Sequence, residues 1–190
     1  VYCMLLTILT PTFNRSELLL CAYKCLCEQG YHDFEWLIID DGSTDDTEKL
    51  FAKFTDVQNN FSIRYYRKDN GGKHTAINYG VKKANGELIL ILDSDDTLPE
   101  DSLATIAQYY EQCKGYKDCA GVCGLMAHHD GQLIGSGFPK DPMYESALQF
   151  RYAEKGNVTG DLLEVYKTSV MREFSFPEIE NEKFCPESLV

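Results

Sequence analysis

The stretch LILILDSDDTL (residues 88–98) decides the fold, because a continuous apolar run leads directly into a cluster of acids. A short apolar run of this kind is typical of a strand that is buried on both faces in a parallel sheet. The predicted strand ends by presenting Asp93, Asp95 and Asp96. Because side chains alternate along a strand, we expect Asp93 and Asp95 to point the same way, about 6.5–7 Å apart. Such a pair suits a hard divalent cation that also binds water and phosphate oxygens. An acidic turn that caps a helix is the alternative, although a cap needs one acid rather than three.

Strands and helices alternate along most of the chain, which predicts an α/β fold with a mostly parallel, twisted, Rossmann-like sheet flanked by helices. The predicted strands are residues 2–10, 34–40, 62–68, 87–92, 119–129 and 161–168. The predicted helices are residues 16–29, 45–55, 74–84 and 99–113, with a further helix beginning in the final PESLV. Trp36 lies in an apolar strand and is expected in the core.

Residues at the ends of the predicted helices indicate where each helix begins or stops. Ser16 is a predicted N-cap and Gly30 a predicted stop for the first helix. Ser43 or Thr44 is expected near the cap of the second helix, and Pro99 in the first turn of the fourth.

The first four predicted strands all end in polar or glycine-rich loops. These loops read PTFNR (11–15), DDGSTDD (40–46), DNGGKH (69–74) and DSDD (93–96). The carboxyl ends of parallel strands share one edge of the sheet, where ligands bind at the switch point in strand order. The sequence therefore predicts a ligand site at this edge.

Two common nucleotide motifs are excluded by the residues that their mechanisms require. The loop after the first strand has no glycine, so it cannot be a G-x-G-x-x-G dinucleotide site. In NGGKHT (70–75), Lys73 is followed by His and the glycine spacing is not that of a P-loop. Gly71, Gly72 and Lys73 still precede a helix N-terminus, which favours phosphate binding, with a plain tight turn as the alternative.

Composition limits the function further. The chain of 190 residues is 44% apolar and 25% charged, which suits one globular domain. A net charge of −12 argues against a nucleic-acid partner. No run approaches the ~20 apolar residues of a membrane span, and the first residues, VYCMLLTILTPTF, read as a strand rather than a signal peptide.

Eight cysteines are expected to be free thiols in a reducing compartment. Cys21 and Cys25 lie one helical turn apart, and Cys113, Cys119 and Cys123 lack the spacing of a zinc ribbon. A zinc site and disulfides are the alternatives.

An aspartate-nucleophile phosphatase is one hypothesis, because haloacid-dehalogenase-type enzymes also place D-x-D-x-T after an apolar strand. Asp93 would then be the nucleophile and Asp95 the acid/base. That motif normally follows the first strand of its domain, whereas three strands are predicted before it here. The downstream acidic motif is also unmatched, since Gly160 and Asp161 are followed by Val165 four positions later rather than by a second Asp.

Three segments together resemble family 2 glycosyltransferases with the GT-A fold. They are TILTPTFNRSELL (7–19), EWLIIDDGSTDDT (35–47) and GGKHTAINYGVKKANGELILILDSDD (71–96). The resemblance covers essentially the whole chain. It implies a single GT-A catalytic domain over residues 1–190, with a nucleotide-binding half (1–98) and an acceptor-side half (99–190) that is truncated at its C-terminus.

The resemblance implies an inverting, metal-dependent hexosyltransferase. Its donor would be a nucleotide-diphospho sugar, with UDP favoured, and its acceptor a glycan or a lipid-linked sugar. The implied setting is bacterial cell-surface polysaccharide synthesis in the cytoplasm at the inner face of the membrane, with peripheral association through segments outside this sequence. The alternative in another class is a non-catalytic nucleotide-sugar binding domain.

The resemblance also implies the roles of particular residues in donor binding. The base pocket would be lined by Thr10, Pro11, Thr12 and Phe13, with the Phe13 ring against the base. Asp41 would bond the base and Asp40 would support it. Lys73 would approach the diphosphate, Asp93 the ribose or the metal, and Asp96 the donor sugar. Asp95 would be the main ligand of a Mg²⁺ or Mn²⁺ ion, with Asp93 as the other.

On the acceptor side, the resemblance implies a general base in a late acidic motif. NEKFCPESLV (181–190) offers Glu187, with Glu180 and Glu182 as rivals. His128, His129 and Asp161 would lie on the acceptor side, where an exposed polar turn is the alternative for the histidines.

Overall fold

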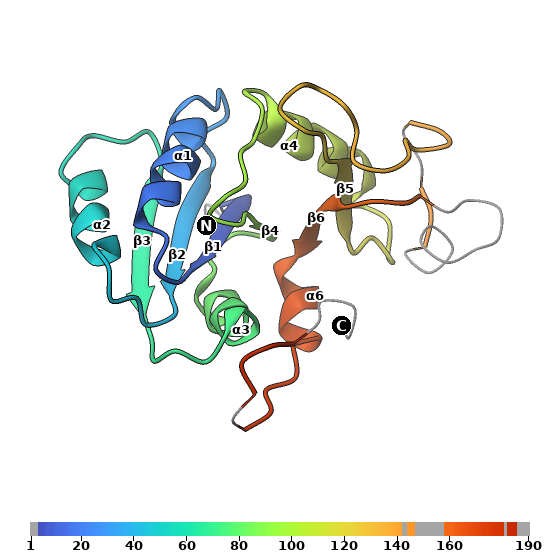
Figure 1. Cartoon of the computed structure of the whole chain (residues 1–190). Helices are drawn as coiled ribbons and strands as arrows, with labels where there is room; N and C mark the ends of the chain where they lie inside the picture. The colour runs from blue at the N-terminus through green and yellow to red at the C-terminus, as the bar shows by residue number, and fades with distance from the viewer. Residues whose placement is uncertain (1–3, 142–143, 147–157, 181, 186–190) are drawn as a thin grey trace. The chain divides into compact units, whose positions relative to one another are not determined.

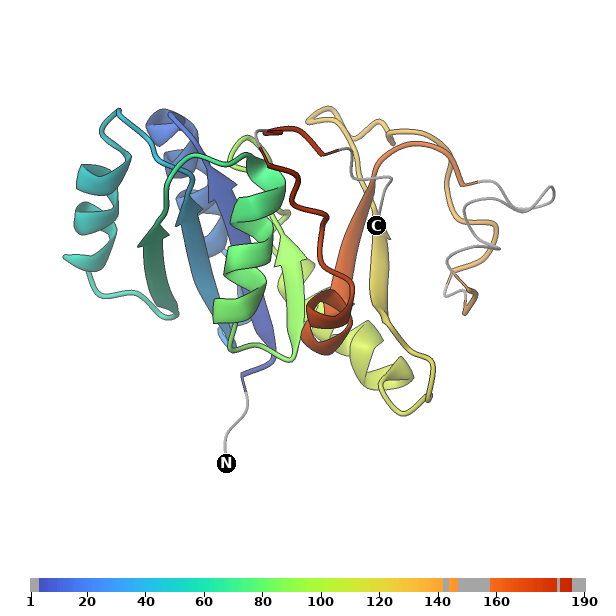
Figure 2. The same cartoon turned by 90° about the horizontal axis from the view of Figure 1, so that it is seen from below.

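The computed structural model describes residues 4–141, 144–146, 158–180 and 182–185. The chain forms two compact units, which are Val1–Val122 with Val165–Val190, and Cys123–Glu164. The first unit carries the predicted nucleotide-binding segments and is shown in Figures 1 and 2. The division into a nucleotide-binding half (1–98) and an acceptor-side half (99–190) remains a prediction.

A mixed sheet forms the centre of the fold, as the alternating pattern predicted. Its order is β3-β2-β1-β4-β6-β5. The strands are β1 Leu6–Thr12, β2 Phe34–Asp40, β3 Ser62–Arg67, β4 Leu88–Ile91, β5 Gly121–Leu125 and β6 Leu162–Lys167. Strand β1 pairs in parallel with β2 and β4, and β2 in parallel with β3. Strand β6 pairs antiparallel with β4, so the mostly parallel prediction is confirmed with one reversed strand.

Helices cover both faces of the parallel part of the sheet. The helices are α1 Ser16–Cys27, α2 Thr47–Thr55, α3 Lys73–Lys83, α4 Ser102–Cys113 and α6 Thr168–Glu173. Figure 2 shows α3 and α6 in front of the strands and α1 behind them. Apolar residues on opposite sides of each strand therefore meet different helices, which explains why the strands are apolar throughout.

The core under α3 is aliphatic, and the core under α1 and α2 contains aromatic rings. Leu9, Leu37 and Ile39 belong to the buried cluster against α3. On the other face, Trp36 is fully buried, as predicted, and its ring lies 5.5 Å from that of Phe54. This burial fixes the strands whose ends build the site.

The predicted boundaries of three helices need correction. Ser16 is the first helical residue of α1 rather than its cap, and α1 ends at Cys27, before the predicted stop at Gly30. Helix α2 begins at Thr47 rather than at residue 45, and its N-cap is Asp46, two residues after Thr44. Pro99 lies before α4, whose N-cap is Asp101, and its carbonyl accepts a bond from the Ser102 N–H at 3.1 Å. Side chains other than the predicted caps meet the first N–H groups of these helices: Asp45 accepts from the Ser16 and Thr47 N–H groups, and Gln29 accepts from the Leu103 N–H.

The second unit, Cys123–Glu164, contains a turn closed by the His128 N–H, which donates to the Gln132 carbonyl at 2.8 Å. His128 and His129 are exposed there, as the polar-turn alternative predicted. Among the described residues, no helix combines the length and apolarity needed to cross a membrane.

Candidate functional site

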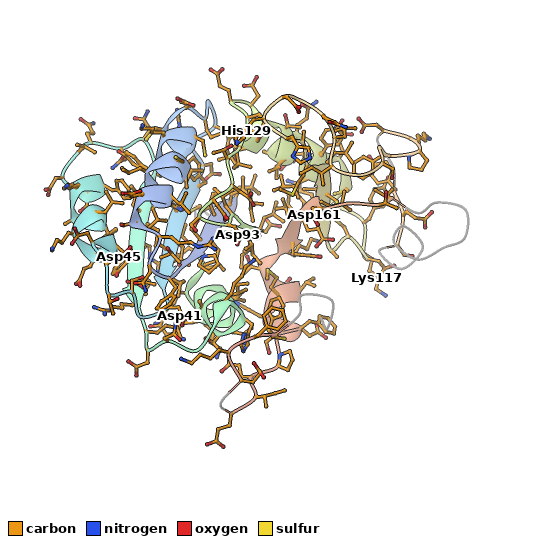
Figure 3. All side chains as sticks on the ribbon, in the orientation of Figure 1. Asp41, Asp45, Asp93, Lys117, His129 and Asp161 are labelled. Carbon is orange, nitrogen blue, oxygen red and sulfur yellow. The ribbon has the colours of Figure 1, made fainter. Side chains whose placement is uncertain are left out.

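The carboxyl ends of β1, β2 and β3 are aligned at one edge of the sheet. In the strand register, Thr12 lies opposite Asp40 and Asp40 lies opposite Arg67. Strand order reverses between β1 and β4, so the loop after β4 meets the loop after β1 at this edge. The edge is the kind of crevice in which open α/β sheets bind ligands. Figure 3 labels Asp41 and Asp93, which follow β2 and β4 there.

Asp41 is the centre of a buried hydrogen-bond cluster that holds the loop before α3. Its carboxylate accepts from Lys68 Nζ at 2.6 Å, from the Gly71 N–H at 3.0 Å and from the Gly72 N–H at 2.7 Å. The Asn70 amide also donates to it, at 3.1 Å. Asp41 is only 3% exposed, so these donors take the place of water. If the base of a nucleotide bonded to Asp41, as predicted, it would have to replace one of these four donors.

Asp40 supports the turn that follows β2. Its Oδ1 accepts from the Ser43 N–H at 2.7 Å, and its Oδ2 accepts from the Tyr65 hydroxyl. Burial and the bond to Asp40 raise the pKa of Tyr65. Asp40 is 1% exposed, which fits the predicted supporting role rather than direct ligand contact.

The four residues predicted for the base pocket differ in exposure. Thr10 is fully buried, and its hydroxyl accepts from Trp36 Nε1 at 2.9 Å. Pro11 and Thr12 are also buried, whereas Phe13 is 45% exposed. The Thr12 hydroxyl is one of two buried side-chain atoms in the described part of the chain with no hydrogen-bond partner. Phe13 and Thr12 are thus the members of this set that could meet a ligand, with Thr10 beneath them.

The acids after β4 form ion pairs with cations from neighbouring loops. Lys73 Nζ lies 2.8 Å from Asp93 Oδ2, and an Arg15 guanidinium nitrogen lies 3.2 Å from Asp95 Oδ1. The expectation that strand alternation aligns Asp93 and Asp95 is wrong, because β4 ends at Ile91 and the Asp96 N–H donates to the Asp93 carbonyl in a turn. The sequence pattern did not single out Arg15 as a site residue, although it ends the PTFNR loop.

Asp93 and Asp95 could hold a divalent ion only if that ion took most of its ligands from elsewhere. No group of three or more His, Cys, Asp or Glu side chains within the described ranges could hold a metal. Magnesium-type ions commonly use one or two carboxylates and complete their shell with water and phosphate oxygens. Both ion pairs are about half exposed, so each contributes only about 0–1 kcal/mol and can be exchanged for other partners.

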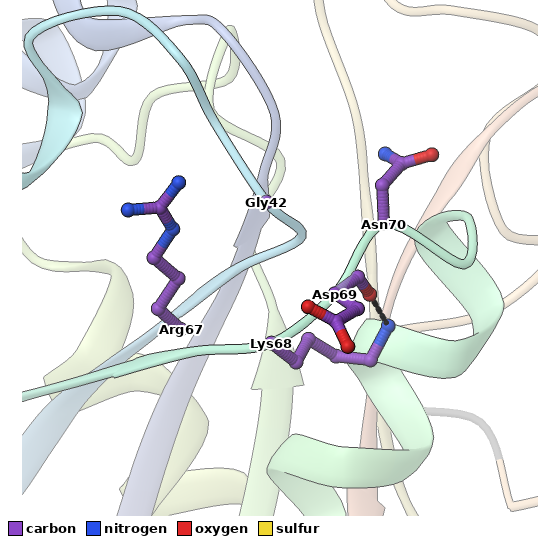
Figure 4. Close-up of a pocket in the computed structure, with 5 residues that line it drawn as sticks. All are labelled: Gly42, Arg67, Lys68, Asp69 and Asn70. Atoms are coloured by element: carbon purple, nitrogen blue, oxygen red, sulfur yellow. Dashed lines mark hydrogen bonds between the residues drawn. The ribbon is translucent and has the colours of Figure 1, made fainter.

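A hollow of about 650 Å³ opens beside the Asp41 cluster and is drawn in Figure 4. It is lined by Gly42, Arg67, Lys68, Asp69 and Asn70. Gly42 has φ +88°, and a Cβ there would lie 2.9 Å from the Asn70 nitrogen, so glycine is needed. Lys68 and Asn70 were not singled out from the sequence, because only the fold brings them to Asp41.

The predicted base, Glu187, lies outside the described residues. Its rivals Glu180 and Glu182 are exposed in the segment after α6. Asp161 is exposed in the second unit, and its predicted acceptor-side role stays a prediction, as do those of His128 and His129.

The described cysteines, seven in all, carry free thiols. Cys113 Sγ and Cys119 Sγ lie 3.2 Å apart. Burial and the bond with Cys119 raise the pKa of the Cys113 thiol to about 11.

Fold and edge together define a Rossmann-like α/β domain with charged side chains gathered at its carboxyl edge. The family model described as glycosyl transferase family 2 matches residues 7–171. The chain therefore belongs to glycosyl transferase family 2, and its fold is of the GT-A type.

Curated relatives agree with this assignment. The GalNAc(5)-diNAcBac-PP-undecaprenol beta-1,3-glucosyltransferase of Campylobacter jejuni is 30% identical over 179 residues, covering 91% of this chain and 55% of that protein. Glycosyltransferase GlyG of Streptococcus pneumoniae is 30% identical over 126 residues, covering 66% of this chain and 40% of that protein. The chain thus spans about half the length, or less, of these relatives.

Solved structures share the fold. S. aureus TarS 1–349 in complex with UDP has a TM-score of 0.66 at 20% identity, covering 92% of this chain and 51% of that one. Mannosyltransferase PcManGT from Pyrobaculum calidifontis, in complex with GDP-Man and Mn²⁺, has a TM-score of 0.66 at 21% identity, covering 94% and 49%. At these identities the likeness concerns the fold alone.

Proposed function

We propose that the protein is an inverting glycosyltransferase that moves a sugar from a nucleotide-diphospho sugar, with UDP favoured, to a glycan or a lipid-linked acceptor. One observation carries the proposal: the loops after four consecutive parallel strands bring buried acids, exposed acids and cations to one edge. Family membership supports the reaction class. Two similar structures are complexes with UDP and with GDP-Man, which supports a nucleotide-sugar donor.

The nucleotide would lie over the ends of β1 and β2. Phe13, exposed at the end of β1, offers a ring for stacking against the base, and Thr12 beside it has an unpaired hydroxyl. Asp41 would accept from the base in place of one of its present donors. Pro11 and Thr10 shape the pocket from below, and Asp40 holds the turn that follows β2.

The diphosphate would lie between Lys73 and the acids after β4. Asp95, with Asp93, would hold a divalent Mg²⁺ or Mn²⁺ ion, and Asp96 would approach the donor sugar. A bound divalent ion would offset the charge that develops on the departing diphosphate. With Asp93 and Asp95 so engaged, Lys73 and Arg15 would be released to bind phosphate oxygens.

A carboxylate in the late acidic part of the chain would take the proton of the attacking acceptor hydroxyl. Glu187 is proposed for this role, with Glu180 and Glu182 as alternatives. The proposed setting is bacterial surface polysaccharide assembly at the inner face of the cell membrane. The C. jejuni relative, whose name describes an undecaprenol-linked acceptor, supports a lipid-linked acceptor class.

Calorimetric titration with UDP, with and without Mn²⁺, tests the donor site. We expect Mn²⁺-dependent binding in the parent chain, a loss of at least tenfold in affinity in Asp95→Asn, and parental affinity in Glu111→Gln. The control also neutralises an ion-paired exposed acid, but on α4. If UDP, GDP and dTDP all fail to bind, the proposal is wrong.

Release of UDP from UDP-sugars separates an enzyme from a non-catalytic binding domain. Binding without release in the presence of candidate acceptors would favour the binding domain. Family membership argues against the phosphatase hypothesis for Asp93. Hydrolysis of a phosphate monoester that Asp93→Asn abolishes would revive it.

A further inference from the structure

An acidic segment follows α6 and runs along α3. The described part of this segment comprises residues 174–180 and 182–185, and it is drawn in dark red beside α3 in Figure 2. It contains Glu178, Glu180 and Glu182, and its described residues form no helix or strand. Within the segment the Glu182 N–H donates to the Ile179 carbonyl at 3.0 Å, but the described residues join no strand, so side chains fix the position of the segment against α3.

Asn78 of α3 is the first anchor of the acidic segment. Its Nδ2 donates to the Phe176 carbonyl at 2.9 Å and to Glu178 Oε1 at 2.7 Å, and its Oδ1 accepts from the Phe176 N–H at 3.0 Å. Asn78 is 5% exposed, so these three bonds replace those that water would make. All three partners belong to the segment, so the buried Asn78 amide is hydrogen-bonded only when the segment is docked. Undocking would leave buried polar groups without partners, which is costly.

The second anchor joins the far end of the segment to the loop that holds Asp41. Lys183 Nζ donates to Asn70 Oδ1 at 2.7 Å, while the same Asn70 amide donates to Asp41. The Lys183 carbonyl lies so close to Gly72 that a Cβ there would be 2.0 Å from the carbonyl oxygen. The segment is therefore held against both the middle of α3 and the loop at its N-terminus.

We propose that Asn78 is a positioning residue, which docks the acidic segment so that its carboxylates are held beside the nucleotide loops. Glu180 and Glu182 lie between the two anchors. The inference rests on the proposed function, because it assigns the docked acids to deprotonation of the acceptor. A base must be within hydrogen-bond reach of the proton it takes, so a loosened segment slows turnover and leaves nucleotide affinity unchanged.

Asn78→Asp tests the anchor with a minimal change of shape. The new carboxylate can still accept from the Phe176 N–H, but it loses both donated bonds and faces Glu178. The double variant Asn78→Asp with Glu178→Gln removes this repulsion and restores a donor between the two side chains. Glu178→Ala removes one anchoring bond at an exposed position and does not threaten folding. Asn60→Asp, at an exposed position before β3, is the matched charge control.

Three quantities are measured in each variant: hydrogen–deuterium exchange of peptides covering residues 174–185, affinity for UDP with Mn²⁺, and the rate of UDP release. The rate is measured on UDP-glucose, UDP-galactose and UDP-GlcNAc, with water as the acceptor. For Asn78→Asp we expect exchange at Phe176 to rise at least tenfold, affinity to stay within twofold, and kcat to fall about 10- to 100-fold at unchanged KM. The exchange rate and kcat of Glu178→Ala should lie between those of the parent and of Asn78→Asp. The double variant should recover exchange protection and kcat together, and Asn60→Asp should match the parent in both.

Several results would overturn the inference. Unchanged exchange in Asn78→Asp would show that Asn78 does not dock the segment. Faster exchange with a parental kcat would show that docking does not serve turnover. A loss of UDP affinity as large as the loss of kcat would show that Asn78 acts on nucleotide binding instead. If the parent chain neither binds nor releases UDP, GDP or dTDP, the proposed function fails and the positioning role fails with it, while the exchange data still decide the docking.

Discussion

Replacing Asp41 by Asn should destabilise the protein as well as weaken nucleotide binding. The substitution keeps the size of the side chain but puts an NH₂ group where Oδ2 accepts from the Gly72 N–H at 2.7 Å. It also removes the charge that pairs with Lys68, in an ion pair whose side chains are 4% and 19% exposed. A donor on the new side chain then faces the Gly72 donor at a position that is only 3% exposed.

The size of the effect follows from these contacts. A hydrogen bond to a charged group contributes about 1.5–3 kcal/mol, and breaking a buried ion pair by removing one charge costs about 3–5 kcal/mol. Lys68 keeps some contact with water, so we expect the free energy of unfolding of Asp41→Asn to fall by about 3–4 kcal/mol. At about 2–4 °C per kcal/mol for a chain of this size, the midpoint of thermal unfolding should fall by about 10 °C.

Urea unfolding followed by circular dichroism measures this change. Asp69→Asn is the matched control, because Asp69 is an exposed aspartate beside Lys68, and its stability should stay within about 0.5 kcal/mol of the parent. A free energy of unfolding for Asp41→Asn within 1 kcal/mol of the parent value would refute the reasoning. It would mean that the loop before α3 does not depend on the buried carboxylate.

Three further predictions concern the core and the titratable groups. Gly80→Ala should lower the free energy of unfolding by about 1–3 kcal/mol in urea, because its Cβ would lie 2.3 Å from Leu9 Cδ1; an unchanged midpoint would contradict this packing. Tyr65 should stay protonated when exposed tyrosines ionise near pH 10, as seen by absorbance at 295 nm, because burial and Asp40 raise its pKa. Because the pKa of Tyr65 is raised in the folded state, folding favours its protonated form. The contribution of Tyr65 to the free energy of unfolding should be full below about pH 10 and should decline as pH rises above it. A Tyr65→Phe variant should lack this decline. Cys113, whose pKa is raised to about 11, should react with iodoacetamide at pH 8 at least tenfold more slowly than exposed Cys21, and equal rates by mass spectrometry would disprove its burial.

Much of the fold could be predicted from local pattern. The apolar runs and the helices between them predicted the strands of the sheet within a few residues, because a strand covered on both faces must be apolar throughout. Polar loops after four successive strands predicted the edge where the candidate site lies. The helix starts were less predictable, since the first N–H groups of α1 and α4 bond to side chains from distant parts of the chain, Asp45 and Gln29, rather than to the expected caps.

By itself, the sequence determined the family, the order of the elements and the edge at which the charged loops gather. Those properties follow from short-range patterns that every strand and helix must satisfy. Only the tertiary structure decided that Asp41 is saturated by the loop before α3, that Arg15 pairs with Asp95, and that Asn78 holds the acidic segment. The physical reason is distance along the chain: the partners of Asn78 lie about 100 residues away. No local pattern specifies such a contact until strand order and loop conformation bring the groups together.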